Sequence, residues 1–119
     1  MYLLEVDSVR HRVHVTLAGT FCETDAQALL DELTERLAEL KADFHVLCDL
    51  TALEDFEKAA RPHYRAVMEL CSHSGARKVI RIIPDPLDNF GVTIMSHIHY
   101  DSTIPIINCK SMNEARKHF

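Results

Sequence analysis

The chain has little glycine and no glycine-rich motif. Only three of its 119 residues are glycine, so loops that cradle phosphate groups with closely spaced glycines are excluded. The Gly-x-Ser-x-Gly turn that presents the nucleophile of many hydrolases is also absent. Neither of these two kinds of site is therefore expected.

The four cysteines are too far apart for a Cys-x-x-Cys pair, and none stands at zinc-finger spacing from a histidine. Cys48 and Cys109 lie in apolar runs, where a reduced thiol packs like a small hydrophobic group. Cys22 is the cysteine that we expect to be exposed, just before a helix. We predict four free thiols in a reducing compartment, and neither a metal nor a cofactor.

Long hydrophobic runs and an excess of positive charge are both missing. No stretch approaches the roughly 20 apolar residues of a membrane-spanning helix. The first apolar run, Tyr2 to Leu4, stops at Glu5, which argues against a signal peptide. Thirteen Lys and Arg against 18 Asp and Glu give a net charge of −5, which disfavours nucleic acid as a partner. We expect a cytoplasmic protein without a membrane span.

What is present is an alternation of strand and helix patterns. Residues 2–6 form a short apolar run, and residues 12–17 alternate polar and apolar side chains, which indicates a half-buried strand paired with the first as a hairpin. Two further apolar runs, 44–50 and 79–83, predict buried strands. A last run, 104–109, contains Pro105, which cannot donate to a sheet and therefore places that strand at an edge.

Helical patterns separate these strands. Thr24 and Gln27 predict a capping box ahead of a leucine stripe that extends to Leu40. A second helix is expected to begin between Glu57 and Pro62, and Gly75 is its predicted stop. A third helix is expected to open at 85–86, and a fourth at residue 111. The predicted fold is one α/β domain over residues 1–119, with a mixed sheet of about five strands, four helices and the order β-β-α-β-α-β-α-β-α.

This order resembles that of the STAS domains, the fold of bacterial anti-sigma-factor antagonists. Gly19 resembles the glycine that follows the family's amphipathic strand, and residues 48–51, Cys-Asp-Leu-Thr, resemble its strand ending in Asp-Leu-Ser. Gly75, followed by the strand 77–83, resembles the family's passage from a helix through a glycine to a strand. Asn-Glu-Ala at 113–115 resembles the Glu-Ala sequence of its final helix. The resemblance implies a signalling module that binds another protein.

One family feature is missing. The resemblance implies a phosphorylatable serine at the opening of the second helix, where this chain has Glu-Lys-Ala-Ala at 57–60. Residues 52–62 contain no Ser, Thr or Tyr, and Thr51 comes too early. Either Glu57 mimics a permanent negative charge, or the domain has left the phosphorylation pathway.

The candidate site lies where the third strand ends and the second helix begins, since ligands of parallel α/β sheets favour the carboxyl ends of strands and the helix N-termini that follow them. It serves either as a protein-docking surface or as a site for a small anionic or lipid ligand, with apolar Leu53, Phe56 and Tyr64 beside it. The alternative without a binding role is a solvated loop with Asp55 as a helix cap. The candidate binding residues are Thr51, Asp55, Glu57, Lys58, Arg61, His63 and Asp85.

Other chemistry has less support from the sequence. Asp49 is expected to hydrogen-bond the loop after its strand rather than act as a catalytic carboxylate. His97 and His99 are two apart on a predicted helix and point about 200° apart, which disfavours a shared metal ion. An enzyme using Asp49 or Asp55 is ranked last, and no catalytic residue is assigned. The hairpin edge is poorly protected, which leaves a homodimer open.

Overall fold

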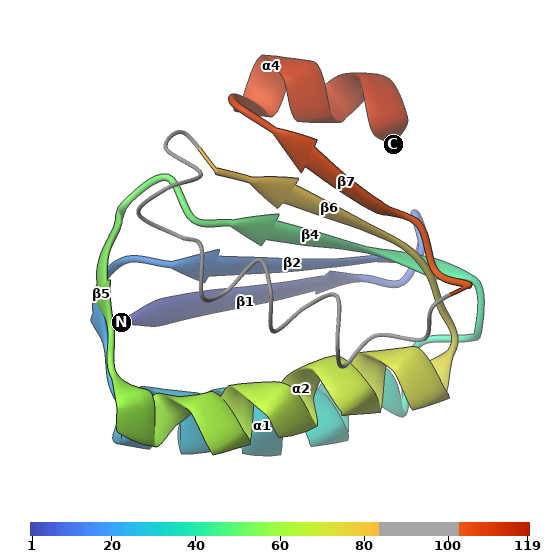
Figure 1. Cartoon of the computed structure of the whole chain (residues 1–119). Helices are drawn as coiled ribbons and strands as arrows, with labels where there is room; N and C mark the ends of the chain where they lie inside the picture. Colours follow the sequence, from blue (N-terminus) through green and yellow to red (C-terminus); the bar gives the residue numbers. More distant parts are fainter. Residues whose placement is uncertain (84–102) are drawn as a thin grey trace.

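The computed structural model describes residues 1–83 and 103–119. A five-stranded mixed sheet forms its centre (Figure 1). Its first two strands are antiparallel, as the predicted hairpin requires, and every later neighbouring pair is parallel. The strands, in spatial order, are β1 (Tyr2–Asp7), β2 (Arg12–Leu17), β4 (Phe44–Asp49), β6 (Ala76–Ile82) and β7 (Ile106–Cys109).

The opening hairpin follows from its residue pattern. In β2, Val13, Val15 and Leu17 are buried, whereas the residues between them are half-buried on the opposite face. The turn is held by Asp7, whose Oδ1 accepts hydrogen bonds from the backbone N–H groups of Val9 (3.0 Å) and residue 10 (2.9 Å). The predicted hairpin and its buried face are confirmed.

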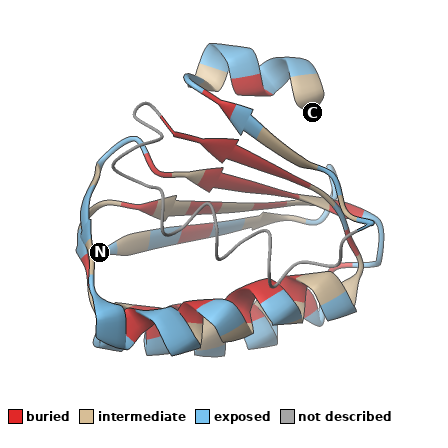
Figure 2. Ribbon diagram, in the orientation of Figure 1, coloured by how far each residue is buried: buried red, intermediate tan, exposed pale blue. Residues whose placement is uncertain are grey.

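Two helices, α1 (Glu23–Leu37) and α2 (Arg61–Ser74), lie side by side on one face of the sheet (Figure 1). Their inner faces and the facing strands are buried, and their outer faces are exposed (Figure 2). This packing buries the leucine stripe of α1 and forms the main core of the domain. The helical stripes predicted from the sequence therefore face the sheet.

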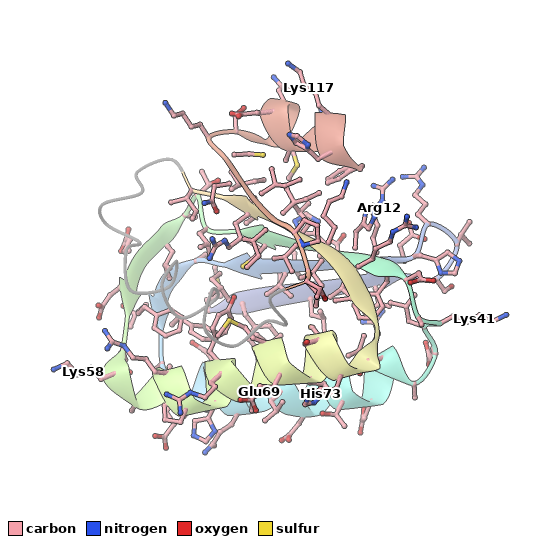
Figure 3. All side chains as sticks on the ribbon, turned by 45° about the vertical axis from the view of Figure 1, so that its right-hand side comes forward. Arg12, Lys41, Lys58, Glu69, His73 and Lys117 are labelled. Atoms are coloured by element: carbon pink, nitrogen blue, oxygen red, sulfur yellow. The ribbon has the colours of Figure 1, made fainter. Side chains whose placement is uncertain are left out.

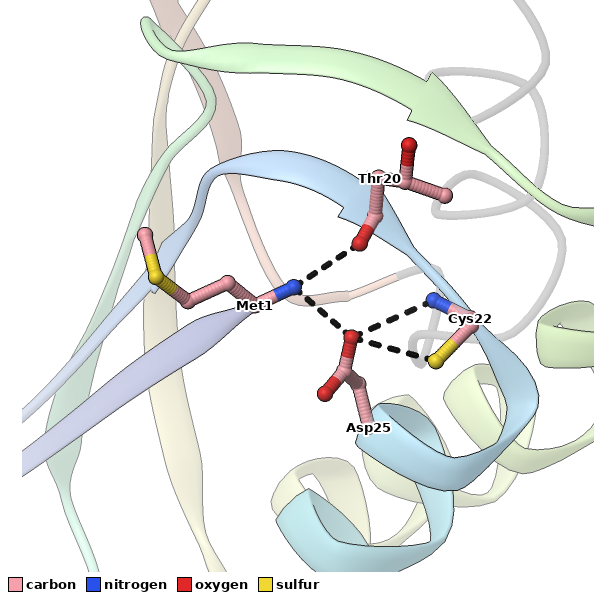
Figure 4. Close-up of polar contacts among 4 residues, drawn as sticks. All are labelled: Met1, Thr20, Cys22 and Asp25. Carbon is pink, nitrogen blue, oxygen red and sulfur yellow. Dashed lines mark hydrogen bonds and ion pairs between the residues drawn. The ribbon is translucent and has the colours of Figure 1, made fainter.

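The start of α1 differs from the prediction. Its N-cap is Cys22, not Thr24, and the capping carboxylate is Asp25. The Asp25 Oδ2 accepts from the Cys22 backbone N–H (3.4 Å), the Cys22 thiol (3.3 Å) and the Met1 ammonium group (2.7 Å), which also donates to the Thr20 carbonyl (Figure 4). The helix starts earlier because a carboxylate at its third position satisfies free donors better than Gln27 would.

The predicted limits of α2 are confirmed. A 3₁₀ turn, Lys58–Ala60, leads into the helix, and Pro62 lies in its first turn. Gly75 ends the helix in the left-handed conformation, with φ +106°. A side chain there would clash, because a Cβ would lie 2.8 Å from the Cα and Cβ of Ala42.

A second, two-stranded sheet was not predicted. The strands β3 (Gly19–Phe21) and β5 (Leu53–Phe56) pair in parallel, although the sequence indicated a strand end at Gly19 and a loop after residue 50. These segments are only three and four residues long, too short to show an alternating pattern. Their pairing depends on the larger sheet, which brings the ends of β2 and β4 together.

The opposite face of the sheet carries the C-terminal elements, α4 (Met112–Ala115) and the 3₁₀ turn Arg116–His118 (Figure 1). Ser111 caps α4 as predicted, accepting from the Glu114 N–H at 3.3 Å. A smaller core lies beneath it. Its buried members are Leu47, Ile80, Ile82, Cys109 and Ala115.

The last strand lies at an edge, as Pro105 predicted, but begins at Ile106 rather than residue 104. Pro105 still takes part through its carbonyl, which accepts from the Val79 N–H at 3.0 Å. Likewise β4 ends at Asp49 rather than at residue 50, and β6 begins at Ala76. The described residues contain three α-helices; the predicted helix that opens at residues 85–86 lies outside them.

Candidate functional site

The predicted site is a continuous segment, residues 51–63, which we call the ridge. It runs from the carboxyl end of β4 through β5 and the 3₁₀ turn into the first turn of α2. Six of the seven predicted residues lie on it, and Asp85 lies outside the described residues. The structure therefore brings the six residues together along one segment that it holds in regular structure.

Backbone hydrogen bonds tie the ridge to β3. The Gly19 N–H donates to the Ala52 carbonyl at 2.8 Å, and the Glu57 N–H donates to the Phe21 carbonyl at 3.1 Å. The Ala60 N–H closes the 3₁₀ turn on the Glu57 carbonyl at 3.0 Å. These bonds hold the backbone of the ridge in place, so little further backbone entropy is lost when a partner binds.

Asp49 has the structural role that the sequence favoured. Its Oδ1 accepts from the Thr51 N–H at 3.0 Å and from the Thr51 hydroxyl at 2.5 Å. Such a turn fixes the direction in which the chain leaves the strand. Thr51 is exposed, but its hydroxyl proton is committed to Asp49.

The charged residues of the ridge are exposed. Asp55, Glu57, Lys58 and Arg61 all face solvent, so acidic groups are followed along the ridge by basic groups. Asp55 lies inside β5, so it is not the helix cap expected in the alternative without a binding role. These side chains are free of the core and can contact another molecule.

His63 contacts the neighbouring helix. It is half-buried, and its Nε2 lies 3.4 Å from the Nε2 of Gln27 in α1. This contact joins the first turns of the two helices. His63 is therefore at the border of the ridge and contributes to holding it in place.

Three aromatic rings support the ridge from beneath. Phe21, Phe56 and Tyr64 have centroid separations of 5.2 to 5.9 Å, and Tyr64 meets both phenylalanines edge to face. Such pairs add stability beyond the burial of their area. The sequence placed Phe56 and Tyr64 beside a ligand, but the structure packs both of them against Phe21, which no sequence signal had linked to the site.

A buried polar contact lies under the aromatic rings. The Cys48 Sγ is 3.3 Å from the Tyr64 hydroxyl, and burial raises the pKa of the Cys48 thiol to about 11. Cys71 is also buried, and burial raises its pKa to about 12. All four cysteines are free, as predicted, and Cys22 is the most accessible of them.

Arg81 is a buried charged residue that the sequence pattern did not reveal. Arg81 lies in β6 with only 1% of its surface exposed, and its Nε donates to the Asn108 Oδ1 of β7 at 3.0 Å. The sequence shows it only as one residue of an apolar strand. Buried arginine is rarely found without hydrogen-bonding partners, so this residue helps to fix β7 against β6.

In residues 1–83 and 103–119, no three His, Cys, Asp or Glu side chains converge as ligands for a metal ion. No helix within these ranges is long and apolar enough to cross a membrane.

Comparison with known proteins gives structural neighbours only. No family model and no curated protein matches the sequence. An uncharacterised protein of the DUF3478 family with a SpoIIAA-like fold, from Shewanella loihica, matches with a TM-score of 0.74 and 13% identity over 99% of this chain and 91% of its own.

Two anti-sigma factor antagonists also match over 99% of this chain. SpoIIAA in its unphosphorylated form has a TM-score of 0.66 and 12% identity over 96% of its length. An antagonist from Mycobacterium paratuberculosis has a TM-score of 0.59 and 17% identity over 93% of its length. The chain therefore has the SpoIIAA-like fold, and the STAS-like architecture expected from the sequence is confirmed.

Proposed function

We propose that this chain is a non-enzymatic regulatory module that binds another protein through the ridge, residues 51–63. The observation that carries the proposal is that an exposed, mixed-charge segment is held rigid by β3 and by the aromatic rings. A preorganised surface loses little entropy on binding. The fold shared with two anti-sigma factor antagonists supports the same class of function.

The proposed module works without a phosphoserine switch on the ridge. Residues 52–62 carry no hydroxyl side chain, and the Thr51 hydroxyl is bonded to Asp49. Glu57 stands at the N-terminal end of the 3₁₀ turn and is exposed. It supplies a constant negative charge at the start of α2, which the helix dipole stabilises.

A small anionic or lipid ligand is the second candidate. Lys58, Arg61 and Arg65 favour it, because three exposed cations lie on the first turns before and within α2. Against it, Phe56 and Tyr64 are packed against each other and against Phe21, so neither ring is fully free to contact a ligand. Native mass spectrometry separates the two candidates: excess mass that disappears on denaturation supports the ligand.

The proposal is tested by capturing partners with tagged protein from an extract of the source organism. Lys58→Glu should reduce recovery of a partner about tenfold, because charge pairs at an interface tune affinity over this range. Lys41→Glu is the matched control, since Lys41 is equally exposed but far from the ridge (Figure 3). Equal loss with both variants, or with neither, contradicts the proposed surface.

The role of Glu57 is tested in the same assay. Glu57→Gln should weaken capture if its constant charge mimics a phosphorylated residue that the partner recognises. Glu35→Gln removes an exposed carboxylate from α1, outside the ridge, and serves as the control. Unchanged capture with Glu57→Gln means that the carboxylate is not part of the recognised surface.

A further inference from the structure

The outermost strand of the main sheet, β1, has a neighbouring strand on one side only (Figure 1). That neighbour, β2, is antiparallel to it, with Tyr2 opposite Leu17 at one end and Asp7 opposite Arg12 at the other. Among residues 1–83 and 103–119, no strand pairs with the second side of β1. Within the part of the chain that the structure describes, β1 is therefore a free edge.

The backbone groups that point to this edge follow from the register of the hairpin. In an antiparallel pair, opposite residues alternate between pairs that exchange hydrogen bonds and pairs that do not. The Ala18 N–H donates to the Met1 carbonyl at 3.0 Å, so the odd-numbered residues of β1 are the ones bonded to β2. The N–H and C=O groups of Tyr2, Leu4 and Val6 consequently point away from β2.

The strand lacks the proline, lysine and bulge that usually block an edge. Its sequence is Tyr-Leu-Leu-Glu-Val-Asp, and its register with β2 is continuous. Apolar surface is left on both sides of it. Leu3 is 56% exposed on the outer face, and Tyr2 and Val6 are only half-buried on the face that packs against the main core. A strand added at this edge would cover both surfaces.

The edge is complementary to a second copy of itself. When two β1 strands pair antiparallel with Leu4 opposite Leu4, Tyr2 of each copy lies opposite Val6 of the other. Every residue with outward backbone groups then faces another such residue, and each opposing pair exchanges two hydrogen bonds. The Tyr–Val pairs join an aromatic to a β-branched side chain, a combination that stabilises antiparallel sheets.

Charge and hydrogen bonding both favour this register over the adjacent ones. With Leu4 at the centre, Glu5 lies opposite Leu3 of the other copy. A shift that centres the pair on Glu5 would place two carboxylates directly opposite each other, which is unfavourable. A shift that centres it on Leu3 would leave the outward groups of Val6 without a partner in the other strand.

The neighbouring helix α1 does not bring unpaired charge to the edge. Two of its carboxylates contact the start of the chain. Asp25 is paired with the Met1 ammonium group at 2.7 Å, and Glu32 accepts from the Tyr2 hydroxyl at 2.7 Å and pairs with Arg36 at 3.9 Å. The charges that α1 places beside β1 are thus balanced within each copy.

We propose that the free edge of β1 is the interface of a homodimer, in which two copies join their sheets through antiparallel β1 strands with Leu4 at the centre. The two copies are related by a two-fold axis, which uses the β1 edge of both, so the assembly closes at two copies. None of the interface residues belongs to the ridge, and the proposal is independent of the proposed function.

The test begins with sedimentation velocity of protein without an N-terminal tag, from micromolar to millimolar concentration. Monomer should convert to dimer as the concentration rises, and no larger species should form. Amide hydrogen exchange measured by NMR then locates the interface. The amides of Tyr2, Leu4 and Val6 should exchange more slowly in the dimer than in the monomer. Protein that stays monomeric, or a dimer without this added protection, would overturn the proposal.

Two substitutions of Leu3 test the register. Because Leu3 is exposed, neither should unfold the protein. Leu3→Glu places a carboxylate opposite Glu5 of the other copy, twice in each dimer, and should raise the dissociation constant of the dimer about tenfold. Leu3→Lys places a cation there and should leave the constant within about threefold of the original. Equal weakening by both substitutions would contradict the register with Leu4 at the centre.

Two substitutions of Val6 separate the backbone from the side chain. Val6→Pro removes an outward N–H that the hairpin does not use, and proline is tolerated at such positions of an edge strand. Val6→Ala shortens the side chain but keeps the N–H. Val6→Pro should stay folded by circular dichroism and lose the dimer, whereas Val6→Ala should keep it. A dimer that survives Val6→Pro would show that β1 does not form the interface.

Discussion

The thiol of Cys48 lies 3.3 Å from the hydroxyl of Tyr64, which joins the middle strand of the sheet to the first turn of α2. Tyr64 also meets Phe21 and Phe56 edge to face. One side chain thus connects β4, β3 and β5 at the base of the ridge. The position of the proposed docking surface is therefore coupled to the main core of the domain.

We predict that only one thiol reacts readily in the native protein. Burial raises the pKa of Cys48 to about 11 and of Cys71 to about 12, and it also raises the pKa of Cys109. Thiolates are the reactive form, so Cys22 should account for the single fast reaction with Ellman's reagent at pH 8. Cys22→Ser should abolish that phase. Four equivalents should react in denaturant, and two fast thiols in native protein would contradict the burial described.

Replacing Gly75 should be more damaging than replacing Gly19. Both have positive φ, +106° and +59°, but a Cβ at Gly75 would lie 2.8 Å from two atoms of Ala42, whereas one at Gly19 meets nothing within 4 Å. We expect Gly19→Ala to cost about 1 kcal/mol and Gly75→Ala about 2–4 kcal/mol in unfolding free energy. Urea denaturation of both variants measures this. Equal losses would mean that α2 can shift away from Ala42.

Asp25 should contribute stability that disappears in acid. Its pKa is lowered chiefly by the hydrogen bond from the Met1 ammonium group, with help from Cys22. A carboxyl whose pKa is lower when folded stabilises the protein above its unfolded pKa of about 3.9, and the contribution is lost as pH falls through the folded value. Asp25→Asn should therefore destabilise at pH 7, and its effect should shrink progressively as the pH falls below about 3.9.

Denaturant unfolding across this pH range measures the effect. Asp31→Asn is the control, because Asp31 is an exposed carboxylate later in the same helix. Its substitution should leave the pH dependence nearly unchanged. A loss for Asp25→Asn that is the same at pH 3 as at pH 7 would show that its ionisation does not stabilise the fold.

Truncating the aromatic rings one at a time should distinguish their contribution to the free energy of unfolding from their contribution to partner capture by the ridge. Phe21 is fully buried, so Phe21→Ala should cost about 3–5 kcal/mol. Phe56 is half-buried, so Phe56→Ala should cost about 1–2 kcal/mol. Because Phe56 supports the ridge, its loss should also lower partner capture while leaving the protein folded at 25 °C. Full capture by folded Phe56→Ala protein would show that the rings do not position the surface.

The sequence by itself determined the main elements, because their patterns repeat over enough residues. The alternation of Val13, Val15 and Leu17 and the stop at Gly75 appear in the structure as predicted. The predicted leucine stripe is confirmed up to Leu37, where α1 ends, and Leu40 lies beyond the helix. Element order and the mixed sheet followed from these patterns, since crossover connections leave few topologies. The location of the candidate site at the end of β4 followed from the same order.

Tertiary structure decided what depends on contacts between distant segments. The pairing of β3 with β5 has no local pattern, because each strand is too short, and it requires β2 and β4 to be adjacent first. The cap at Cys22 depends on Asp25 and on the nearby Met1 ammonium group. The contact between Arg81 and Asn108 is likewise invisible in the sequence, because the two residues belong to different strands and become neighbours only through strand register.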